Sequence, residues 1–250
     1  MTPRFHVDRV LAAGAVFDLP APQARHVQVL RLQPGDALTL FTGRGGEWAA
    51  RVVGMGRATV EVSVDAHVAV DRELARSVTL ACGMPANERM DALVEKATEL
   101  GVASIQPLIC ERSVLRLSGE RAARRLEHWQ GIAAGASEQS GRTVVPLIHP
   151  VLSLRGWLDD ISDAPASTPC RIVLSPDADM PFATGIGASG HAPIVVLSGP
   201  EGGLSPAEVN AARVAGFMPM SLGPRVLRAD TAPLAVLAWC GLDAALQGPG

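Results

Sequence analysis

The order of apolar and polar side chains changes in character near residue 70. Before that point, short runs such as residues 36–41 and 59–64 alternate between the two kinds of side chain, which predicts β-strands with one buried face. Residues 42–46 read T-G-R-G-G and predict a turn between two strands. A short helix is predicted for residues 23–31. The first part of the chain is therefore predicted to be a β meander or a small barrel.

Beyond a charged connector, apolar runs alternate with helical patterns. Asn87 can cap one helix and Ser118 a longer one, while residues 147–168 show a less ordered pattern. Strands that are apolar throughout and separated by helices predict a parallel sheet covered on both faces, so the fold class is α/β. We place the boundary between two domains, residues 1–72 and 73–250. The buried strands are predicted at residues 78–83, 103–110, 171–176, 194–199 and 217–222.

The composition is that of a folded globular protein. Of the 250 residues, 48% are hydrophobic and 19% are charged, and no apolar run reaches the roughly 18 residues of a membrane-spanning helix. The first ten residues include four charged or histidine side chains, and no apolar block follows them, which argues against a secretory signal. We therefore expect a cytoplasmic protein without a membrane segment.

Cysteine and histidine residues form none of the local spacings that bind metal ions. The six histidines include no H-x-x-H or H-E-x-x-H spacing, so no metal is predicted. The cysteines are far apart and lie mostly inside apolar runs, which favours buried reduced thiols over a disulfide framework. They are Cys82, Cys110, Cys170 and Cys240.

The net charge of −3 argues against a protein that coats nucleic acid through bulk electrostatics. The charge is unevenly spread, however, because residues 111–125 hold five arginines and two glutamates. Arginine suits phosphate groups because its planar guanidinium can bind two oxygens at once, although a solvated helical face is the alternative. The candidate contacts to a partner are Arg25, His26 and Arg31 in the first domain and Arg121, Arg124 and Arg125 in the second.

Two loops rich in glycine and proline follow apolar runs near the C-terminus, and each leads into a helix. The first reads G-P-E-G-G at residues 199–203, and the capping-box pattern Ser205-Pro-Ala-Glu208 follows it. The second lies at residues 222–228, before a helix that Asp230 or Thr231 can cap. Such loops at strand ends present backbone N–H groups to a ligand, while a plain tight turn is the alternative for the first.

Neither loop has the sequence of a known phosphate cradle. The chain contains no G-x-x-x-x-G-K-[ST] motif and no G-x-G-x-x-G motif after a strand, so ATP and NAD are disfavoured. The helix start after the second loop orients Arg228 and Asp230 toward the same loop region. Arg228 and Asp230 are therefore candidate catalytic residues, and a purely structural ion pair between them is the alternative.

Four sequence blocks stand in order along the second part of the chain. They are R-M-D-A-L-V-E-K-A-T-E-L-G at 89–101, E-Q-S-G-R at 138–142, G-P-E-G-G-L-S-P-A-E at 199–208 and L-G-P-R-V-L-R-A-D-T-A at 222–232. Together they resemble the 16S ribosomal RNA uracil-N3 methyltransferases of the SPOUT superfamily. In the first domain, R-F-H and R-H-V-x-V-L-R extend the resemblance to nearly the whole chain. The family usually has Thr-Glu after the Leu-Arg pair, whereas this chain has Ala229-Asp230.

The resemblance implies an N-terminal PUA-like β-barrel domain for RNA and a C-terminal SPOUT-type α/β domain tied in a deep trefoil knot. It also implies a homodimer, S-adenosylmethionine as the cofactor, and a uridine of 16S ribosomal RNA in the small ribosomal subunit as the target. Arg4 of R-F-H then joins the basic residues above as an RNA contact. The implied cofactor-binding residues are Leu174, Ser175, Leu197, Gly199, Pro200, Glu201, Gly202, Leu222, Gly223, Val226, Leu227 and Arg228.

The chemistry that the resemblance implies needs few groups. The sulfonium methyl is already activated, but uracil N3 is a poor nucleophile until its proton leaves. We expect Arg228 to stabilise the developing charge on the uracil carbonyl oxygens, with Glu201 or Asp230 orienting it or accepting the proton. Two alternatives stay open. One is a non-catalytic RNA-binding or ribosome-assembly factor with this fold, and the other is an SPOUT methyltransferase acting on another RNA site or on a ribose 2′-oxygen.

Overall fold

The chain divides into two compact units. The computed structural model describes residues 2–86, 88–162, 170–187 and 192–247, so the predicted cap at Asn87 lies outside the described residues. The sequence boundary near residue 72 assigned residues 134–145 to the second domain, whereas the structure joins them to the first unit. The units are Met1–Glu73 with Ala134–Val145, and Leu74–Ala133 with Pro146–Gly250.

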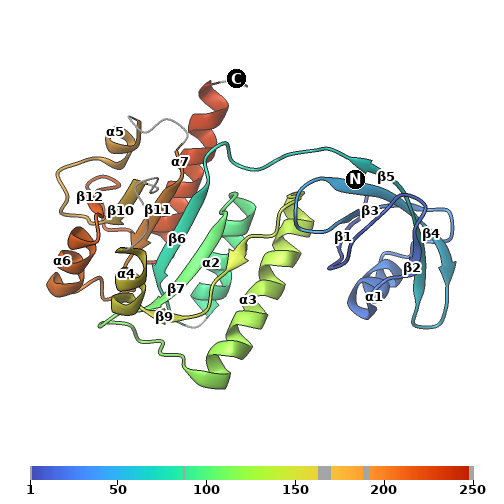
Figure 1. Cartoon of the computed structure of the whole chain (residues 1–250), viewed down its shortest axis with the longest axis horizontal. Coiled ribbons are helices and arrows are strands. Elements are labelled where there is room, and N and C mark those ends of the chain that lie inside the picture. The colour runs from blue at the N-terminus through green and yellow to red at the C-terminus, as the bar shows by residue number, and fades with distance from the viewer. Residues whose placement is uncertain (1, 87, 163–169, 188–191, 248–250) are drawn as a thin grey trace. The chain divides into compact units, whose positions relative to one another are not determined.

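The first unit is a five-stranded sheet with one helix of its own (Figure 1). Its elements are β1 (Arg4–His6), β2 (Val16–Asp18), α1 (Ala21–Val29), β3 (Ala37–Phe41), β4 (Glu47–Met55) and β5 (Val60–Val68). The strand order is β1-β3-β4-β5-β2, and only the β1–β3 pair is parallel. The alternation predicted for residues 59–64 is confirmed, because Val60, Val62 and Val64 are buried in the core of this unit.

Residues 134–145 complete the first unit through main-chain hydrogen bonds. The N–H of Gly45 donates to Thr143 O and the N–H of Val145 donates to Gly43 O, each at 3.1 Å. Gly43 has a φ of 75°, and a Cβ there would lie 2.9 Å from Val145 Cγ2. The glycine-rich turn predicted between β3 and β4 is therefore also the place where this distant segment attaches.

A group of arginines around one glutamate fixes the same segment. Arg4 forms an ion pair with Glu47, and Arg72 Nη1 lies 3.1 Å from the same carboxylate. Arg4 also donates to Arg142 O at 2.9 Å, and Arg72 donates to Gly141 O at 2.9 Å. Only 9% of the Arg4 side chain is exposed. Arg4 therefore holds this unit together, in place of the RNA contact expected of it.

The second unit is built on a parallel sheet in the order β12-β10-β11-β6-β7-β8, with β9 also pairing with β7. This arrangement confirms the predicted α/β class, and every strand predicted in this part of the chain is present. The elements are β6 (Val78–Gly83), α2 (Glu88–Glu99), β7 (Ser104–Ile109), α3 (Gly119–Ser140), β8 (Leu147–Ile148), β9 (Leu152–Ser153), α4 (Leu154–Ser162), β10 (Cys170–Leu174), α5 (Phe182–Gly187), β11 (Ile194–Ser198), α6 (Pro206–Val214), β12 (Met218–Met220) and α7 (Thr231–Gln247).

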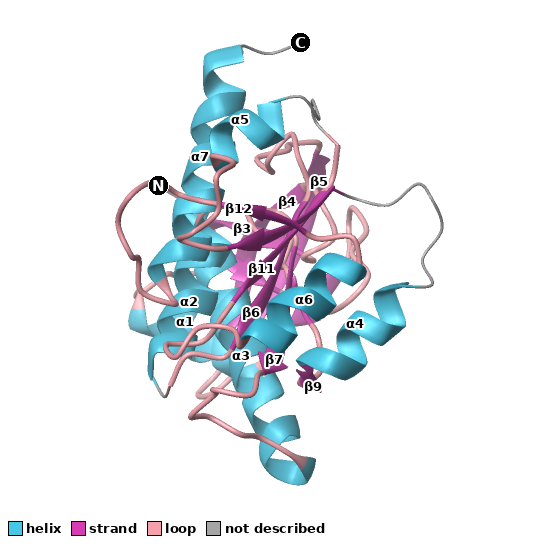
Figure 2. Ribbon diagram, turned by 90° about the vertical axis from the view of Figure 1, so that its left-hand side faces the viewer, coloured by secondary structure: helices cyan, strands magenta, loops and turns pink. Residues whose placement is uncertain are grey.

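Helices cover both faces of this sheet (Figure 2). Helices α2 and α7 pack together on one face, and α4 and α6 pack together on the other. On the second face, the rings of Trp157 and Phe217 lie 5.8 Å apart over a core that includes Val173 and Leu197. Strands that are buried from both sides must be apolar throughout, which is the pattern that the sequence shows.

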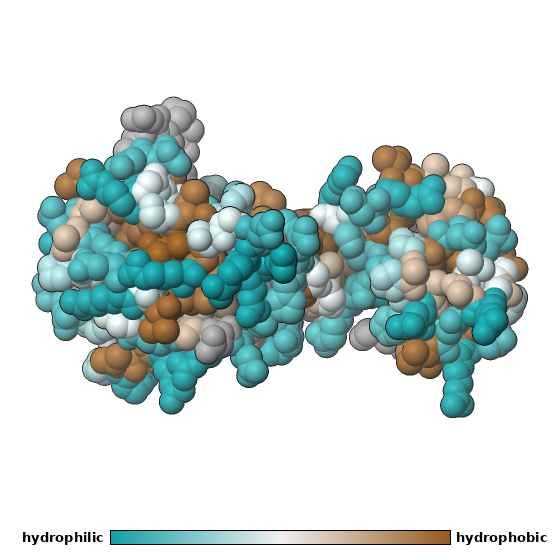
Figure 3. Space-filling model, turned by 90° about the horizontal axis from the view of Figure 1, so that it is seen from below, coloured by the Kyte–Doolittle hydropathy of each residue, from teal (hydrophilic) through white to brown (hydrophobic). Residues whose placement is uncertain are grey.

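Most of the face shown in Figure 3 is hydrophilic, and its apolar side chains are scattered in small groups. Among the described residues, no helix combines the length and the apolar character that a membrane span requires. The four cysteines form no disulfide in the described part of the chain. Cys82, Cys110 and Cys240 are buried, as the sequence predicted, whereas Cys170 is only partly buried.

Replacing Glu47 with Gln should destabilise the protein in a pH-dependent way. Burial raises the pKa of Glu47, but hydrogen bonds from Arg72 and Arg4 and their charges outweigh burial, so the pKa lies below its ordinary value of 4.5. The ionised carboxylate therefore stabilises the fold above about pH 4.5, and this contribution is lost as the pH falls further. We expect Glu47→Gln to lower the free energy of unfolding by about 1–3 kcal/mol at pH 7 and by much less at pH 4.

Urea unfolding at both pH values measures this difference. The exposed pair of Arg51 and Asp65 on the same sheet supplies the control, since Asp65→Asn should change stability by less than about 1 kcal/mol. An equal loss for Glu47→Gln at both pH values would contradict the assigned role.

Candidate functional site

The carboxyl ends of the neighbouring parallel strands β10, β11 and β12 surround a cavity of about 960 Å³. Leu174 and Ser175 line it at the end of β10. The loop of residues 199–204, after β11, and the loop of residues 222–230, after β12, form most of the remaining wall together with α6. This edge of a parallel sheet is where α/β proteins bind ligands, and the volume suits an organic molecule of cofactor size.

The first loop, residues 199–204, is fixed to neighbouring segments by polar contacts. Glu201 Oε1 accepts a hydrogen bond from the N–H of Ala86 at 2.9 Å, and Arg112 Nη1 donates to Gly202 O at 3.1 Å. Helix α6 follows with the predicted capping box: Ser205 Oγ accepts from the N–H of Glu208, whose carboxylate accepts from the N–H of Ser205. The loop is therefore held in place before any ligand arrives.

Close packing of backbone also fixes this loop against β6. A Cβ on Gly83, the last residue of β6, would lie 2.5 Å from Pro200 Cδ, 2.6 Å from Pro200 N and 2.9 Å from Cys110 Sγ. Only glycine leaves room for the loop to approach the strand this closely. The position of Pro200 in the cavity wall thus depends on the missing side chain at residue 83.

The second loop, residues 222–230, has fewer hydrogen bonds to distant segments of the protein than the first loop. Within the described part of the chain, none of its backbone N–H groups donates a hydrogen bond to another protein group. At the end of this loop, Arg228 O accepts from the N–H groups of Thr231 and Ala232 and so begins α7. Gly223, Arg225 and Val226 are exposed and line the cavity, so their backbone N–H groups are available to a polar ligand.

Most of the residues predicted for the cofactor lie together on the cavity wall, and two do not. Leu197 is fully buried in the core between the sheet and helices α4 and α6, because alternate residues of β11 face opposite sides. Gly202 lies behind the wall, where its carbonyl binds Arg112. The predicted residues that line the cavity are Leu174, Ser175, Gly199, Pro200, Glu201, Leu222, Gly223, Val226, Leu227 and Arg228.

The two candidate carboxylates differ in their surroundings. Glu201 lines the cavity, and its Oε1 is occupied by the N–H of Ala86, with Arg89 Nη1 at 3.8 Å. Asp230 lies just behind the wall, and its Oδ1 is buried without a hydrogen-bond partner among the described residues. No ion pair joins Asp230 to Arg228 in that part of the chain, so the alternative of a structural pair is not formed.

Several charged residues of the wall were not predicted. Four further arginines and one aspartate come from separate segments that only the fold brings together. Arg89 lies within the first of the four sequence blocks and Arg225 within the fourth, which was the available signal. The residues are Arg89, Arg112, Asp177, Arg213 and Arg225.

Buried thiols near the first loop are unsuited to nucleophilic chemistry. Burial raises the pKa of Cys82 to about 11, although the neighbouring Ser198 hydroxyl opposes this. Burial and then the charge of Glu208 raise the pKa of Cys110 to about 12. Both groups are therefore protonated at neutral pH, and only a thiolate attacks efficiently.

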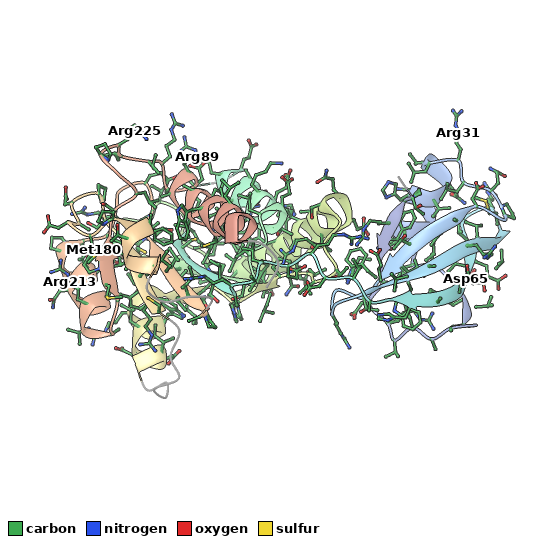
Figure 4. The ribbon with its side chains drawn as sticks, turned by 90° about the horizontal axis from the view of Figure 1, so that it is seen from above. Arg31, Asp65, Arg89, Met180, Arg213 and Arg225 are labelled. Carbon is green, nitrogen blue, oxygen red and sulfur yellow. The ribbon has the colours of Figure 1, made fainter. Side chains whose placement is uncertain are left out.

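The basic residues predicted to contact RNA fall into two groups. In the first unit Arg25, His26 and Arg31 are exposed, and Figure 4 shows Arg31 projecting into solvent from the end of α1. In the second unit Arg121 is exposed on α3, where Arg124 pairs with Glu120 and Arg125 lies 3.7 Å from Asp91. Each group lies on the surface of its own unit. Arg124 and Arg125 already have acidic neighbours there, whereas the others do not take part in such a pair among the described residues.

Comparison with known families assigns most of the chain. Residues 72–241 match the RNA methyltransferase domain, and residues 19–65 match the RNA methyltransferase PUA domain. Ribosomal RNA small subunit methyltransferase E of Synechocystis sp. is 34% identical over 225 residues, which cover 90% of this chain and 72% of that protein. The protein of the same name from Bacillus subtilis is 30% identical over 89% of this chain and 88% of its own length.

Solved structures resemble the fold throughout. The Neisseria gonorrhoeae ribosomal RNA small subunit methyltransferase E bound to S-adenosylmethionine superposes with a TM-score of 0.87 at 35% identity, covering 96% of each chain. A putative methyltransferase of Legionella pneumophila in complex with the same cofactor gives a TM-score of 0.88 at 30% identity, over 97% of this chain and 98% of that one.

Replacing Gly83 with Ala should destabilise the protein, because the added methyl group meets Pro200 at a distance that real Cβ atoms do not adopt. We expect a loss of about 1–3 kcal/mol in the free energy of unfolding, measured by urea titration. Gly131→Ala in α3 is the control: its Cβ would meet no atom within 4 Å, so that change should raise stability by up to about 1 kcal/mol. Equal effects of the two substitutions would show that the loop does not depend on this contact.

Proposed function

The chain belongs to the ribosomal RNA small subunit methyltransferase E family, and we propose that it methylates N3 of one uridine in that RNA. It is an S-adenosylmethionine-dependent methyltransferase of small-subunit ribosomal RNA. The single observation that carries the site assignment is the cavity wall formed by the second loop, where free backbone N–H groups lie beside Arg228. The assignment to uracil N3 follows the resemblance in the four sequence blocks.

The residues of the cavity fit S-adenosylmethionine. Its adenine ring is flat and suits an apolar slot, and both adenine and ribose carry hydrogen-bonding groups. The second loop offers backbone N–H groups without protein partners between Leu222 and Leu227. Leu174 and Met220 supply apolar wall at the ends of β10 and β12. When bound, this cofactor supplies a methyl group activated by a sulfonium centre. The protein therefore has to align the acceptor and manage one proton, and no covalent intermediate is required.

Arg228 is proposed to act on the acceptor base. Loss of the N3 proton spreads negative charge over the two uracil carbonyl oxygens, and a guanidinium within reach stabilises that charge. The Arg228 side chain lines the cavity, is exposed, and has no side-chain partner in the described part of the chain. It is therefore free to donate to a substrate, which a side chain in an ion pair is not.

Asp230 is the better candidate for orienting Arg228 or accepting the proton. Glu201 already accepts from the N–H of Ala86, and Arg89 lies nearby, so its carboxylate anchors the first loop. Asp230 has a buried oxygen that lacks a partner, two residues from Arg228. A buried acceptor without a partner is costly, and that cost would be relieved by a donor that arrives with substrate or with movement of Arg228. These observations support Asp230 without excluding Glu201 from a lesser part.

The wider biological setting is proposed on the family resemblance. We propose a cytoplasmic homodimer, with the deep trefoil knot that the resemblance implies and cofactor sites near the subunit interface. Helix α7 supports the dimer, because it is rich in apolar residues and its Leu242 is 67% exposed. Arg25, His26 and Arg31 on the first unit, and Arg121 on α3, are proposed to contact the RNA, with smaller parts for Arg124 and Arg125.

Replacing Arg228 with Ala should abolish most methyl transfer while S-adenosylmethionine still binds. Removing one preorganised donor from a developing negative charge typically lowers kcat by about 100- to 1000-fold. Transfer of labelled methyl to unmethylated small subunits measures kcat, and calorimetry measures cofactor affinity. Arg155→Ala on α4 is the control, since Arg155 pairs with Asp159 outside this cavity and should leave both values unchanged. Failure of the wild-type protein to bind S-adenosylmethionine would refute the proposed function.

Deleting the gene should remove one 3-methyluridine from small-subunit ribosomal RNA. Mass spectrometry of that RNA measures the mark, and re-expression of the wild-type protein, but not of Arg228→Ala, should restore it. Loss of a different mark, such as a ribose 2′-O-methyl group, would assign the enzyme to another site. An unchanged pattern of marks would favour the non-catalytic ribosome-assembly factor.

A further inference from the structure

The cavity wall carries more positive charge than its cofactor can use. Five arginines and two carboxylates line it, which leaves a surplus of three positive charges. S-adenosylmethionine is itself a cation, with a sulfonium and an ammonium group against one carboxylate. A cationic ligand alone does not complement a cationic wall. The surplus therefore points to a second, anionic ligand at the same cavity.

We propose that Arg89 and Arg225 form a phosphate-binding rim that holds the RNA backbone beside the target uridine. This inference rests on the proposed function and extends it to residues that neither the four-block resemblance nor the loop geometry assigned. The occupant is the phosphodiester of a single-stranded RNA segment, since a base presented to the cavity must leave its stack and bring its flanking phosphates with it.

Arg225 and Arg89 reach the cavity from different elements. Arg225 belongs to the second loop, is exposed, and has no side-chain partner among the described residues. Arg89 lies in the first turn of α2, and 43% of its side chain is exposed. Figure 4 shows both along the same edge of the second unit, whereas Arg213, on α6, lies apart from them. The two arginines therefore line the same cavity from different elements.

The contacts of Arg89 leave it able to bind a further anion. Its Nη1 lies 3.8 Å from Glu201 Oε1, beyond hydrogen-bond distance, and the N–H of Ala86 already donates to that oxygen at 2.9 Å. The remaining N–H groups of Arg89 are free to form the two parallel bonds with which arginine binds phosphate. Arg112 is a poorer candidate because it donates to Gly202 O.

The other anion that could occupy the rim is the carboxylate of the cofactor's methionine part. The two occupants differ in a measurable way, because RNA phosphates release bound counterions and a single small carboxylate does not. Each phosphate contact on a single strand contributes about 0.7 to the slope of log affinity against log salt concentration. Loss of two such contacts should therefore flatten that slope by about 1.4.

The test compares Arg89→Gln/Arg225→Gln with the wild-type protein. Binding of a fluorescent short oligouridylate is measured over a salt series in the presence of S-adenosylhomocysteine, which fills the cofactor site without turnover. We expect weaker binding of the oligouridylate and a slope flatter by about 1.4, with S-adenosylmethionine affinity unchanged in calorimetry. Arg89→Lys/Arg225→Lys should retain most of the slope, because a lysine still contributes charge. Arg155→Gln, on α4, should behave as the wild-type protein.

An unchanged salt slope would overturn the proposal, and loss of S-adenosylmethionine affinity with that slope unchanged would assign the two arginines to the cofactor carboxylate. Methylation of unmethylated small subunits is measured separately. A wild-type protein that leaves their uridines unmodified would refute the proposed function, while a flattened slope in the double variant would still support the rim. The methylation assay therefore tests the proposed function, and the salt dependence of RNA binding tests the phosphate-binding rim.

Discussion

The cavity depends on how the first loop is tied to its neighbours. Glu201 and Glu208 each accept a hydrogen bond from the main chain of a separate loop, at Ala86 and at Glu111, over 2.9 and 2.7 Å. Both acceptors are carboxylates, and charged acceptors make stronger hydrogen bonds than neutral ones. The carboxyl ends of β6, β7 and β11 are thereby held together. One wall of the cavity exists before the ligand binds, so less conformational entropy is lost on binding.

The second loop complements this rigid wall. Its backbone N–H groups have no internal partners among the described residues, while its end is fixed by the start of α7 at Thr231. The first loop is fixed before the ligand binds, and the second offers backbone N–H groups that can exchange water for a ligand. The same loop carries Arg225 and Arg228, so filling of the cofactor site and presentation of the arginines involve one segment.

The sequence predicted those parts of the fold that depend on residues within a few positions of one another. The all-apolar strands of the parallel sheet and the capping box at Ser205 were predictable, because burial on both faces and helix starts leave marks within a few residues. Helix α4 was missed, although Leu154, Trp157, Leu158 and Ile161 have helical spacing, because the surrounding residues 147–168 obscured it. Residues from distant segments, such as Arg89 and Arg225, meet only after the sheet forms. The inward or outward direction of Leu197 likewise depends on strand register, which no single stretch specifies.

The first unit is built from two segments that lie far apart in the sequence, so it cannot be completed until the second segment has been synthesised. Synthesis proceeds from the N-terminus, and domains tend to fold as they emerge. Here the turn near Gly43 and the hydrogen bond from Arg4 to Arg142 O wait for residues 134–145, which leave the ribosome only after β6, α2, β7 and most of α3. The unit that is encoded first is therefore completed late. A nascent chain that stops at residue 72 has all five strands of the sheet but lacks the segment that packs on the turn near Gly43, and Arg4 lacks the carbonyl of Arg142.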